Sequence, residues 1–301
     1  MLRILLPGKT GQVGWELQGA LAPLGTVIAL DRSGMDLANP DSIRRAIRDA
    51  KPEIIVNAAA YTFVDKAESE PELAMRINGV APGIMAEEAK RLGATLIHYS
   101  TDYVFDGELD RPYSEDDSPN PVSEYGRSKL AGEQAIASSG ATHLIFRTSW
   151  VYAARGQNFV RTMLRLGRER SELRIVDDQV GAPTWARFIA EATAQVLRQL
   201  GDGHKAIGDR AGIYNLTATG AVSWYGFASA VFAEAKTQLG MTPPKLIPIT
   251  TAEYPLPARR PANSRLDTSK LTRTFGLAPP DWKTMLTACM RDMQAEMGNS
   301  K

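Results

Sequence analysis

The residues Gly8-Lys9-Thr10-Gly11-Gln12-Val13-Gly14 give the strongest indication of the fold of this chain. It follows an apolar segment, Arg3 to Pro7, that predicts a β-strand, and it leads into a predicted helix, Gln12 to Leu21. Glycines spaced GxxGxxG in a first strand–helix turn permit a tight turn and let the backbone approach a pyrophosphate at the positive end of the helix. We therefore expect the loop, from Gly8 and Thr10 onward, to bind the diphosphate of a dinucleotide.

An acidic residue stands where such a dinucleotide would place its adenosine ribose. Asp31 ends a second apolar segment, Val27 to Leu30, about 20 residues after the glycines, and an acid there accepts hydrogen bonds from ribose hydroxyls. Its charge disfavours a 2′-phosphate, but Arg32 and Lys9 could offset that repulsion. The sequence therefore leaves both NADH and NADPH open.

Outward from this loop, short apolar runs alternate with amphipathic stretches. The pattern predicts helices over Pro40–Ala50, which Asn39 would cap, and over Pro71–Leu92, with strands at Ile54–Ala59, Leu96–Tyr99 and Leu144–Phe146. Strands that alternate with helices imply right-handed βαβ units and a parallel sheet. We predict an α/β fold, a doubly wound parallel Rossmann-type sheet with a smaller substrate-binding lobe.

The second half of the chain has a different pattern. It predicts helices over Asn158–Arg170 and Ala186–Leu200, a polar loop over 201–212, a strand at Ile213–Leu216, and a proline-rich segment of loops and short strands over Lys245–Pro261. We expect residues 1–150, together with 186–217, to form the dinucleotide-binding domain. Residues 151–185 and 218–301 would then form the substrate-binding lobe.

A YxxxK motif, Tyr125 to Lys129, supplies the candidate catalytic pair. Residues four apart on a helix share a face, so Lys129 is expected to approach the Tyr125 hydroxyl, lower its pKa from ~10, and also hold the nicotinamide ribose. Tyr125 could then give a proton to a developing alkoxide. Thr101 follows a predicted strand at the ligand-binding edge of the sheet, where it would hydrogen-bond a substrate carbonyl or hydroxyl. The alternative for Tyr125 and Lys129 is a pair of side chains on the surface of a helix. The alternative for Thr101 is a strand-end hydroxyl that caps its own backbone.

Bulk properties exclude several classes of protein. With 35 basic and 34 acidic residues the formal charge is +1, which argues against nucleic-acid binding. No apolar run reaches the ~18 residues of a membrane helix, and the N-terminus lacks the pattern of a signal peptide. The single cysteine, Cys289, fits a reducing compartment, so we expect a cytoplasmic protein. His98, His143 and His204 are not at metal-binding spacing, and we expect them to be structural or on the surface.

Several segments together resemble the dTDP-4-dehydrorhamnose reductase family of the extended short-chain dehydrogenases: GKTGQVGWEL, NAAAYTFVDKAESEP, HYSTDYVFDG, YGRSKLAGE, FRTSWVYA, DDQVGAPT and RRPANSRLD. The resemblance runs from Leu2 to about Trp282. It implies NAD(P)H-dependent reduction of the 4-keto group of dTDP-4-dehydro-L-rhamnose to dTDP-L-rhamnose, a donor for bacterial cell-surface polysaccharide.

The resemblance also assigns roles by position. Tyr125 would be the proton donor with Lys129 as its partner, and Thr101 would stand where most relatives have a serine. Cofactor contacts would come from Gly11, Gln12, Val13, Asp31, Asp36, Leu37, Ala60, Tyr61, Thr62 and Tyr99, and sugar contacts from Thr101, Asp102 and Trp150. Trp150 would stack on a sugar face or else pack in the core. In the second lobe, the candidates for binding the thymidine diphosphate are Arg259, Arg260, Asn263 and Ser264.

Some reductases of this family bind Mg²⁺ through carboxylates where two subunits meet. This chain keeps Glu16 and Asp292 at two of these positions but has Arg187 at the third. An arginine offers only donors and positive charge, so we expect it to pair with Glu16 or Asp292 in place of a metal. A homodimer is left open.

Related functions occur on the same fold. A 4,6-dehydratase is disfavoured because Tyr103 follows Thr101 and Asp102, where dehydratases carry a glutamate. A 4-epimerase and a non-catalytic regulatory subunit remain open, although the retained Tyr125 and Lys129 favour an active enzyme.

Overall fold

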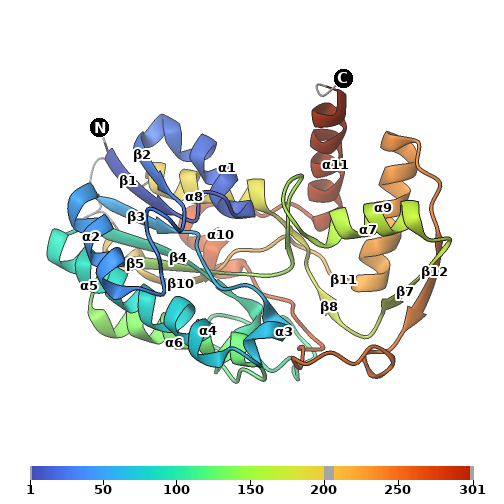
Figure 1. Ribbon diagram of the computed structural model, residues 1–301, viewed down its shortest axis with the longest axis horizontal. Helices are drawn as coiled ribbons and strands as arrows, with labels where there is room; N and C mark the ends of the chain where they lie inside the picture. Colours follow the sequence, from blue (N-terminus) through green and yellow to red (C-terminus); the bar gives the residue numbers. More distant parts are fainter. Residues whose placement is uncertain (1, 200–206, 299–301) are drawn as a thin grey trace.

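A six-stranded parallel sheet organises the first part of the molecule (Figure 1). The computed structural model describes residues 2–199 and 207–298. The strand order is β10-β5-β4-β3-β1-β2, so the direction of winding reverses between β1 and β3. Ligands bind at such a switch point, beyond the carboxyl ends of the strands. The strands are β1 (Leu2–Pro7), β2 (Gly25–Leu30), β3 (Ile54–Asn57), β4 (Thr95–Thr101), β5 (His143–Thr148) and β10 (Gly212–Asn215).

Helices cover both faces of this sheet, as the alternating pattern predicts. The α1 helix (Gln12–Leu21) and the α8 helix (Ala186–Gln199) pack on one face, and α2 (Pro40–Ala50), α5 (Ala81–Leu92) and α6 (Glu124–Ser139) pack on the other. Every residue of β3 and β4 is buried, because both faces are covered. The predicted α/β fold with a doubly wound Rossmann-type sheet is confirmed. Asn39 caps α2 as expected, since its side chain accepts from the N–H groups of Asp41 and Ser42.

Two sequence predictions need correction. The strand predicted over 54–59 ends at Asn57. The single helix predicted over 71–92 is divided into α4 (Pro71–Met75), a π-helical turn (Arg76–Val80) and α5. Pro82 lacks the N–H that an α-helix would bond to the Asn78 carbonyl, and the Ala81 N–H bonds to Arg76, five residues back.

A second apolar core lies beside the sheet (Figure 1). It is built from α7 (Phe159–Glu169), α9 (Trp224–Leu239), α11 (Trp282–Gly298) and the parallel pair β7 (Glu172–Val176) and β12 (Lys245–Ile249). The structure confirms helices near 158–170 and 186–199 and a short strand in the proline-rich segment. Leu200, His204 and most of the predicted loop over 201–212 lie outside the described residues.

The remaining elements are short. They are η1 (Ala22–Leu24), α3 (Val64–Ala67), η3 (Asp102–Val104), η5 (Gly208–Arg210), η6 (Thr251–Glu253), α10 (Ser269–Phe275) and the two-residue strands β6 (Val151–Tyr152), β8 (Val180–Gly181), β9 (Thr184–Trp185) and β11 (Val222–Ser223). Within the described part of the chain, no helix combines the length and the apolar character needed to cross a membrane.

Candidate active site

The glycine loop packs tightly against the end of β3, at the switch point of the sheet. Gly8 has a φ of +87°, and a Cβ on it would lie 2.6 Å from the Ala59 nitrogen. A Cβ on Gly14 would lie 2.0 Å from the Gly8 oxygen, so neither position accepts a side chain. The first residue before α1 is Gly11, and no side chain caps this helix. An uncapped helix start beside a glycine turn fits a bound diphosphate.

Asp31 lies at the end of β2 with both carboxylate oxygens engaged. Its Oδ1 accepts from the backbone N–H and the hydroxyl of Ser33, and its Oδ2 lies 3.0 Å from Lys9 Nζ. The Ser33 hydroxyl and the Lys9 ammonium hold the pKa of Asp31 well below its usual value. Asp31 therefore stays an anion at any physiological pH, with a cation beside it. Nearby, Arg32 lies 3.6 Å from Asp36.

The segment after β3 is held by a side chain that sequence reasoning missed. Asn78, in the π-helical turn, accepts from the Tyr61 N–H and donates to the Tyr61 carbonyl, each at 2.9 Å. It also donates to the Ser128 hydroxyl of α6 at 3.1 Å. Asn78 thus fixes Ala60, Tyr61 and Thr62, the predicted cofactor-binding segment, to the helix that carries Tyr125. The one signal for it in the sequence was Pro82, inside an otherwise helical pattern.

Thr101 and Tyr125 meet at the carboxyl end of β4. The Thr101 hydroxyl donates to Asp102 Oδ1 at 2.9 Å and accepts from the Tyr103 N–H. The Tyr125 ring lies edge-on to the Tyr103 ring, with 5.5 Å between centroids. Burial raises the pKa of Asp102 to about 6. The predicted pair of a strand-end hydroxyl and a helix tyrosine therefore lies in one buried site.

The pKa of Tyr125 shifts in the direction opposite to the one predicted from the YxxxK spacing. Burial raises the pKa of Tyr125 above its usual value, the charge of Asp102 adds to this, and a hydrogen bond with Thr101 offsets it only in part. Lys129 is directed elsewhere, since its Nζ lies 2.6 Å from the Tyr99 carbonyl and 3.3 Å from His98 Nε2. Tyr125 is therefore a neutral phenol at physiological pH, the form that donates a proton.

The side chain of Tyr99 belongs to the core. Its hydroxyl lies 2.7 Å from the Thr193 hydroxyl of α8, and its ring packs beside Phe146. Its backbone carbonyl accepts from Lys129. The resemblance assigned Tyr99 to the cofactor, but its side chain is engaged in a buried hydrogen bond to the helix that covers this face of the sheet.

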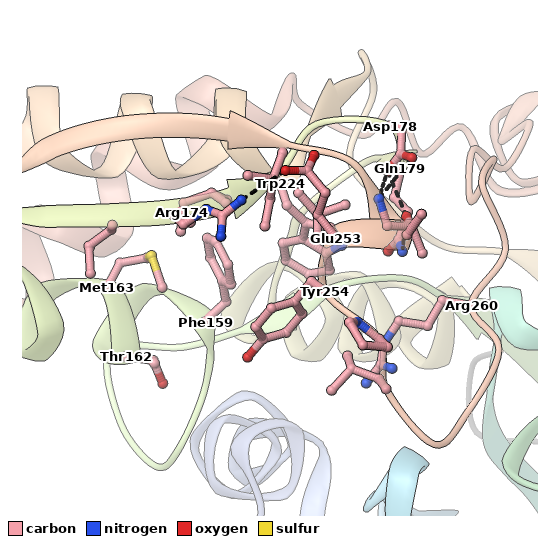
Figure 2. A pocket seen from close by; sticks show the side chains of 18 of the residues that line it. Phe159, Thr162, Met163, Arg174, Asp178, Gln179, Trp224, Glu253, Tyr254 and Arg260 are labelled. Carbon is pink, nitrogen blue, oxygen red and sulfur yellow. Dashed lines mark hydrogen bonds and ion pairs between the residues drawn. The ribbon is translucent and has the colours of Figure 1, made fainter.

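A cavity of about 1180 Å³ lies in the second part of the molecule, among α7, β7, β12 and the segment that follows β12 (Figure 2). Phe159, Trp224 and Tyr254 give it aromatic walls, and an ion pair between Arg174 and Glu253, 2.8 Å apart, lies at its side. Sequence reasoning placed a substrate lobe here but named none of these residues. They come from four separate segments, so no single motif announces them.

Arg260 lies between this cavity and the pair of Tyr103 and Tyr125. It lines the cavity and forms a two-point ion pair with Asp65 of α3, at 2.9 and 2.8 Å. Although burial opposes it, hydrogen bonds with Asp65 and Tyr103 raise the pKa of Arg260. Because Tyr103 lies against Tyr125, Arg260 and Tyr103 link the cavity to the predicted proton donor.

The other residues predicted to bind substrate differ in the contacts that they make within the protein. Arg259 lines the cavity and is largely exposed, 3.9 Å from Glu108. The Asn263 amide donates to the carbonyls of Leu109 and Arg111, so it ties down a neighbouring loop. Ser264 donates its backbone N–H to Val180. Trp150 has a positive φ of 48° and stacks on Trp224, with ring centroids 3.5 Å apart.

The positions of the family's magnesium ligands form a salt bridge here. Arg187 donates from Nε to Glu16 at 3.0 Å and also pairs with Asp292, as the sequence predicts. Both carboxylates face a guanidinium that offers no lone pair to a metal. This set of donors does not fit Mg²⁺, and no group of three potential ligand residues occurs among residues 2–199 and 207–298.

The chain is similar in sequence to known proteins of one family. The family model described as the RmlD substrate binding domain matches residues 2–295. A dTDP-4-dehydrorhamnose reductase from Burkholderia thailandensis is 49% identical over 298 residues, which cover 98% of this chain and 100% of the relative.

Solved structures give the same result. A dTDP-4-dehydrorhamnose reductase from Clostridium acetobutylicum superimposes with a TM-score of 0.89 and 37% identity, covering 97% of this chain and 99% of that one. The enzyme of the same name from Bacillus anthracis, in complex with NADP, has a TM-score of 0.87, 34% identity and the same coverage. The chain belongs to the RmlD substrate binding domain family and, within it, to the dTDP-4-dehydrorhamnose reductases, which are oxidoreductases.

Proposed function

We propose that this protein reduces the 4-keto group of dTDP-4-dehydro-L-rhamnose to the hydroxyl of dTDP-L-rhamnose, using NADPH or NADH. The observation that carries the proposal is the Tyr125 site. A neutral, partly buried phenol lies beside Thr101, at the edge of the sheet where ligands bind, next to a cavity large enough for a nucleotide.

The residues around the switch point would hold the cofactor. The diphosphate would lie on the glycine loop and the start of α1, from Gly8 and Thr10 to Val13, with the adenosine ribose on Asp31 and the nicotinamide ribose near Lys129. When bound, the reduced nicotinamide supplies the hydride. The Lys9 ammonium next to Asp31 supports use of NADPH as well as NADH, because it offsets the repulsion of a 2′-phosphate.

Residues 151–185 and 218–301 would form the substrate-binding lobe. The cavity in this lobe would bind the thymidine diphosphate. Trp224 and Tyr254 offer aromatic surfaces to the base, and the exposed Arg259 offers a guanidinium to the diphosphate. The sugar would then point past Arg260 toward Thr101, Asp102 and Tyr125, with Trp150 as a further wall.

Protein groups then complete the reaction. As the C4 oxygen gains negative charge, the Tyr125 hydroxyl donates its proton to that oxygen. The Thr101 hydroxyl would turn from Asp102 Oδ1 and donate its hydrogen bond to the same oxygen. The raised pKa keeps the proton on Tyr125 until charge develops. The Lys129 ammonium, on turning from the Tyr99 carbonyl, would afterwards return a proton to the phenolate.

The test is turnover of NADPH with freshly generated dTDP-4-dehydro-L-rhamnose, compared with its UDP analogue. Stoichiometric NADPH oxidation with formation of dTDP-L-rhamnose supports the proposal. A product that forms without net cofactor consumption would indicate an epimerase, and no turnover with either substrate would favour the regulatory subunit. In keeping with the family, we further propose a cytoplasmic protein whose partner is the nucleotide sugar. Its association state is to be measured by light scattering.

A further inference from the structure

His98 is a buried histidine without a role in the reaction as described above. It lies on β4 with 1% of its surface exposed, between Asn57 on β3 and Lys129 on α6. Its Nδ1 lies 3.1 Å from Asn57 Nδ2, and its Nε2 lies 3.3 Å from Lys129 Nζ. Both ring nitrogens therefore have a partner within hydrogen-bond distance.

The orientation of the Asn57 amide decides where the ring carries its hydrogen. The Ala59 N–H donates to Asn57 Oδ1 at 3.2 Å, which turns the Nδ2 donor toward His98 Nδ1. Nδ1 must then be the acceptor nitrogen. Burial, and then the charge of Lys129, push the pKa of His98 well below its usual value, so the ring is neutral. A neutral imidazole has one N–H, which leaves it on Nε2, directed at Lys129.

This arrangement is unusual for a lysine ammonium. An Nε2–H that faces Nζ meets a donor when the lysine is charged and a lone pair when it is neutral. The Tyr99 carbonyl accepts from Nζ at 2.6 Å in either state. The nearest carboxylate on the same helix is Glu133, one turn on. Its two oxygens accept from Arg147 of β5 at 3.0 and 2.6 Å. Burial lowers the pKa of Lys129 to about 8, and the charge of Glu133 opposes that shift only in part.

We propose that His98 is a positioning residue for Lys129, held by Asn57 in the tautomer that presents an N–H to the lysine nitrogen. The contact destabilises the ammonium relative to the amine, which makes Lys129 a ready proton donor rather than a fixed cation. In turnover the Lys129 side chain would turn from the Tyr99 carbonyl and give the Nζ proton to the Tyr125 phenolate, and a proton from solvent would restore the ammonium. The inference deepens the proposed function, but its structural part does not depend on it.

The tautomer can be read directly by ¹⁵N NMR of the wild-type protein labelled at histidine. The chain has three histidines, and the His98 signals are assigned by their loss in His98→Gln. We expect a neutral ring protonated on Nε2 across the pH range of activity. A ring protonated on Nδ1 would overturn the inference whatever the protein catalyses, whereas absence of sugar reduction would overturn only the proposed function.

The kinetic test is the pH profile of kcat. Asn57→Ala removes the donor to Nδ1 without adding charge, so the ring is free to move its hydrogen to Nδ1 and accept from the ammonium. We expect the alkaline limb of the profile to move to higher pH by about one unit. A shift of this size is expected when a donor that faces the Lys129 ammonium is replaced by an acceptor. His98→Gln should move it in the same direction, because an amide oxygen can face Lys129.

The matched control is His143→Gln on β5. That ring is partly exposed and bonds only the Ala141 carbonyl nearby, so the profile should keep its wild-type position. A limb that stays in place or moves to lower pH in Asn57→Ala, with the wild-type profile in the control, would show that His98 accepts from Lys129 and would refute the proposal.

Discussion

Lys9 and Asp31 form an ion pair across the mouth of the predicted adenosine site, with 3.0 Å between Nζ and Oδ2. Lys9 comes from the glycine loop, and Asp31 comes from the end of the neighbouring strand β2. The pair places an acceptor for ribose hydroxyls and a cation for a phosphate within one contact of each other. Asp31 is therefore expected to favour NADH, and Lys9 is expected to favour NADPH.

Asp31→Ala should shift cofactor preference toward NADPH. The change removes the ribose acceptor and the charge that repels a 2′-phosphate, while Lys9 remains. We expect the ratio of kcat/KM for NADPH over NADH to rise about tenfold, the size of one hydrogen bond to a charged group. Lys9→Ala should move the ratio the other way. Asp41→Ala, which changes an exposed carboxylate on α2, serves as control and should leave the ratio alone.

Tyr125→Phe tests proton donation, since it keeps the ring and removes the hydroxyl. General acid catalysis typically contributes ~10² to 10⁴-fold in rate, so kcat should fall within that range while the Kd for NADPH changes little. The matched control is Tyr225→Phe on α9, which should retain full activity. If kcat of Tyr125→Phe stays within about threefold of wild type, another group donates the proton.

Asp102 should make folding stability depend on pH in an unusual direction. Its pKa is about 6 in the folded protein and 3.8 in a model peptide, so between these values the folded state binds more protons than the unfolded state. Its contribution to stability is therefore lost as the pH rises through about 6. Asp102→Asn should stabilise the protein at pH 7.5 by at most about 3 kcal/mol and have no effect near pH 4.

The measurement is urea denaturation at both pH values. Asp106→Asn provides a control of opposite sign, because a hydrogen bond from Tyr113 lowers the pKa of Asp106. That variant should lose stability at pH 7.5 and little at pH 4. Equal effects of Asp102→Asn at the two pH values would mean that its carboxylate is not penalised by burial.

Chelation should leave this protein unchanged, because Arg187 pairs with both Glu16 and Asp292. We expect the same turnover and the same association state with EDTA and with millimolar Mg²⁺, measured by NADPH oxidation and light scattering. Arg187→Glu should create three neighbouring carboxylates, so its melting temperature should rise on addition of Mg²⁺. Loss of activity on chelation of the wild type, restored by Mg²⁺, would contradict the assignment.

Local patterns were enough to predict the frame of the site. The GxxGxxG turn, the cap at Asn39 and the placement of Tyr125 after β4 depend on residues close in sequence, and they were predicted correctly. Helix α9 was not predicted, because its Ala- and aromatic-rich sequence shows no clear polar face. The cavity was not predicted in detail either, since its walls come from segments far apart in the chain.

The electrostatics of the site could not be predicted in the same way. The YxxxK spacing suggested a lowered pKa for Tyr125, but the balance depends on burial and on Asp102, which only the folded structure brings together. Asn263 was named as a candidate for binding the thymidine diphosphate, and nothing in the sequence indicated that its amide donates to the loop carbonyls of Leu109 and Arg111. In both cases the residue type was informative, and its partners came from distant parts of the chain.

The π-helical turn at Arg76–Val80 has a consequence for how this chain tolerates changes in length. Each residue of an α-helix advances the chain by about 100° around the axis, so one residue deleted from the turn would rotate Asn78 relative to α5 by that angle. The bonds from Asn78 to Tyr61 and Ser128 would then be lost together. Substitutions at the exposed positions of this turn can be absorbed, whereas an insertion or deletion of a single residue would uncouple the predicted cofactor-binding segment from the helix that carries Tyr125.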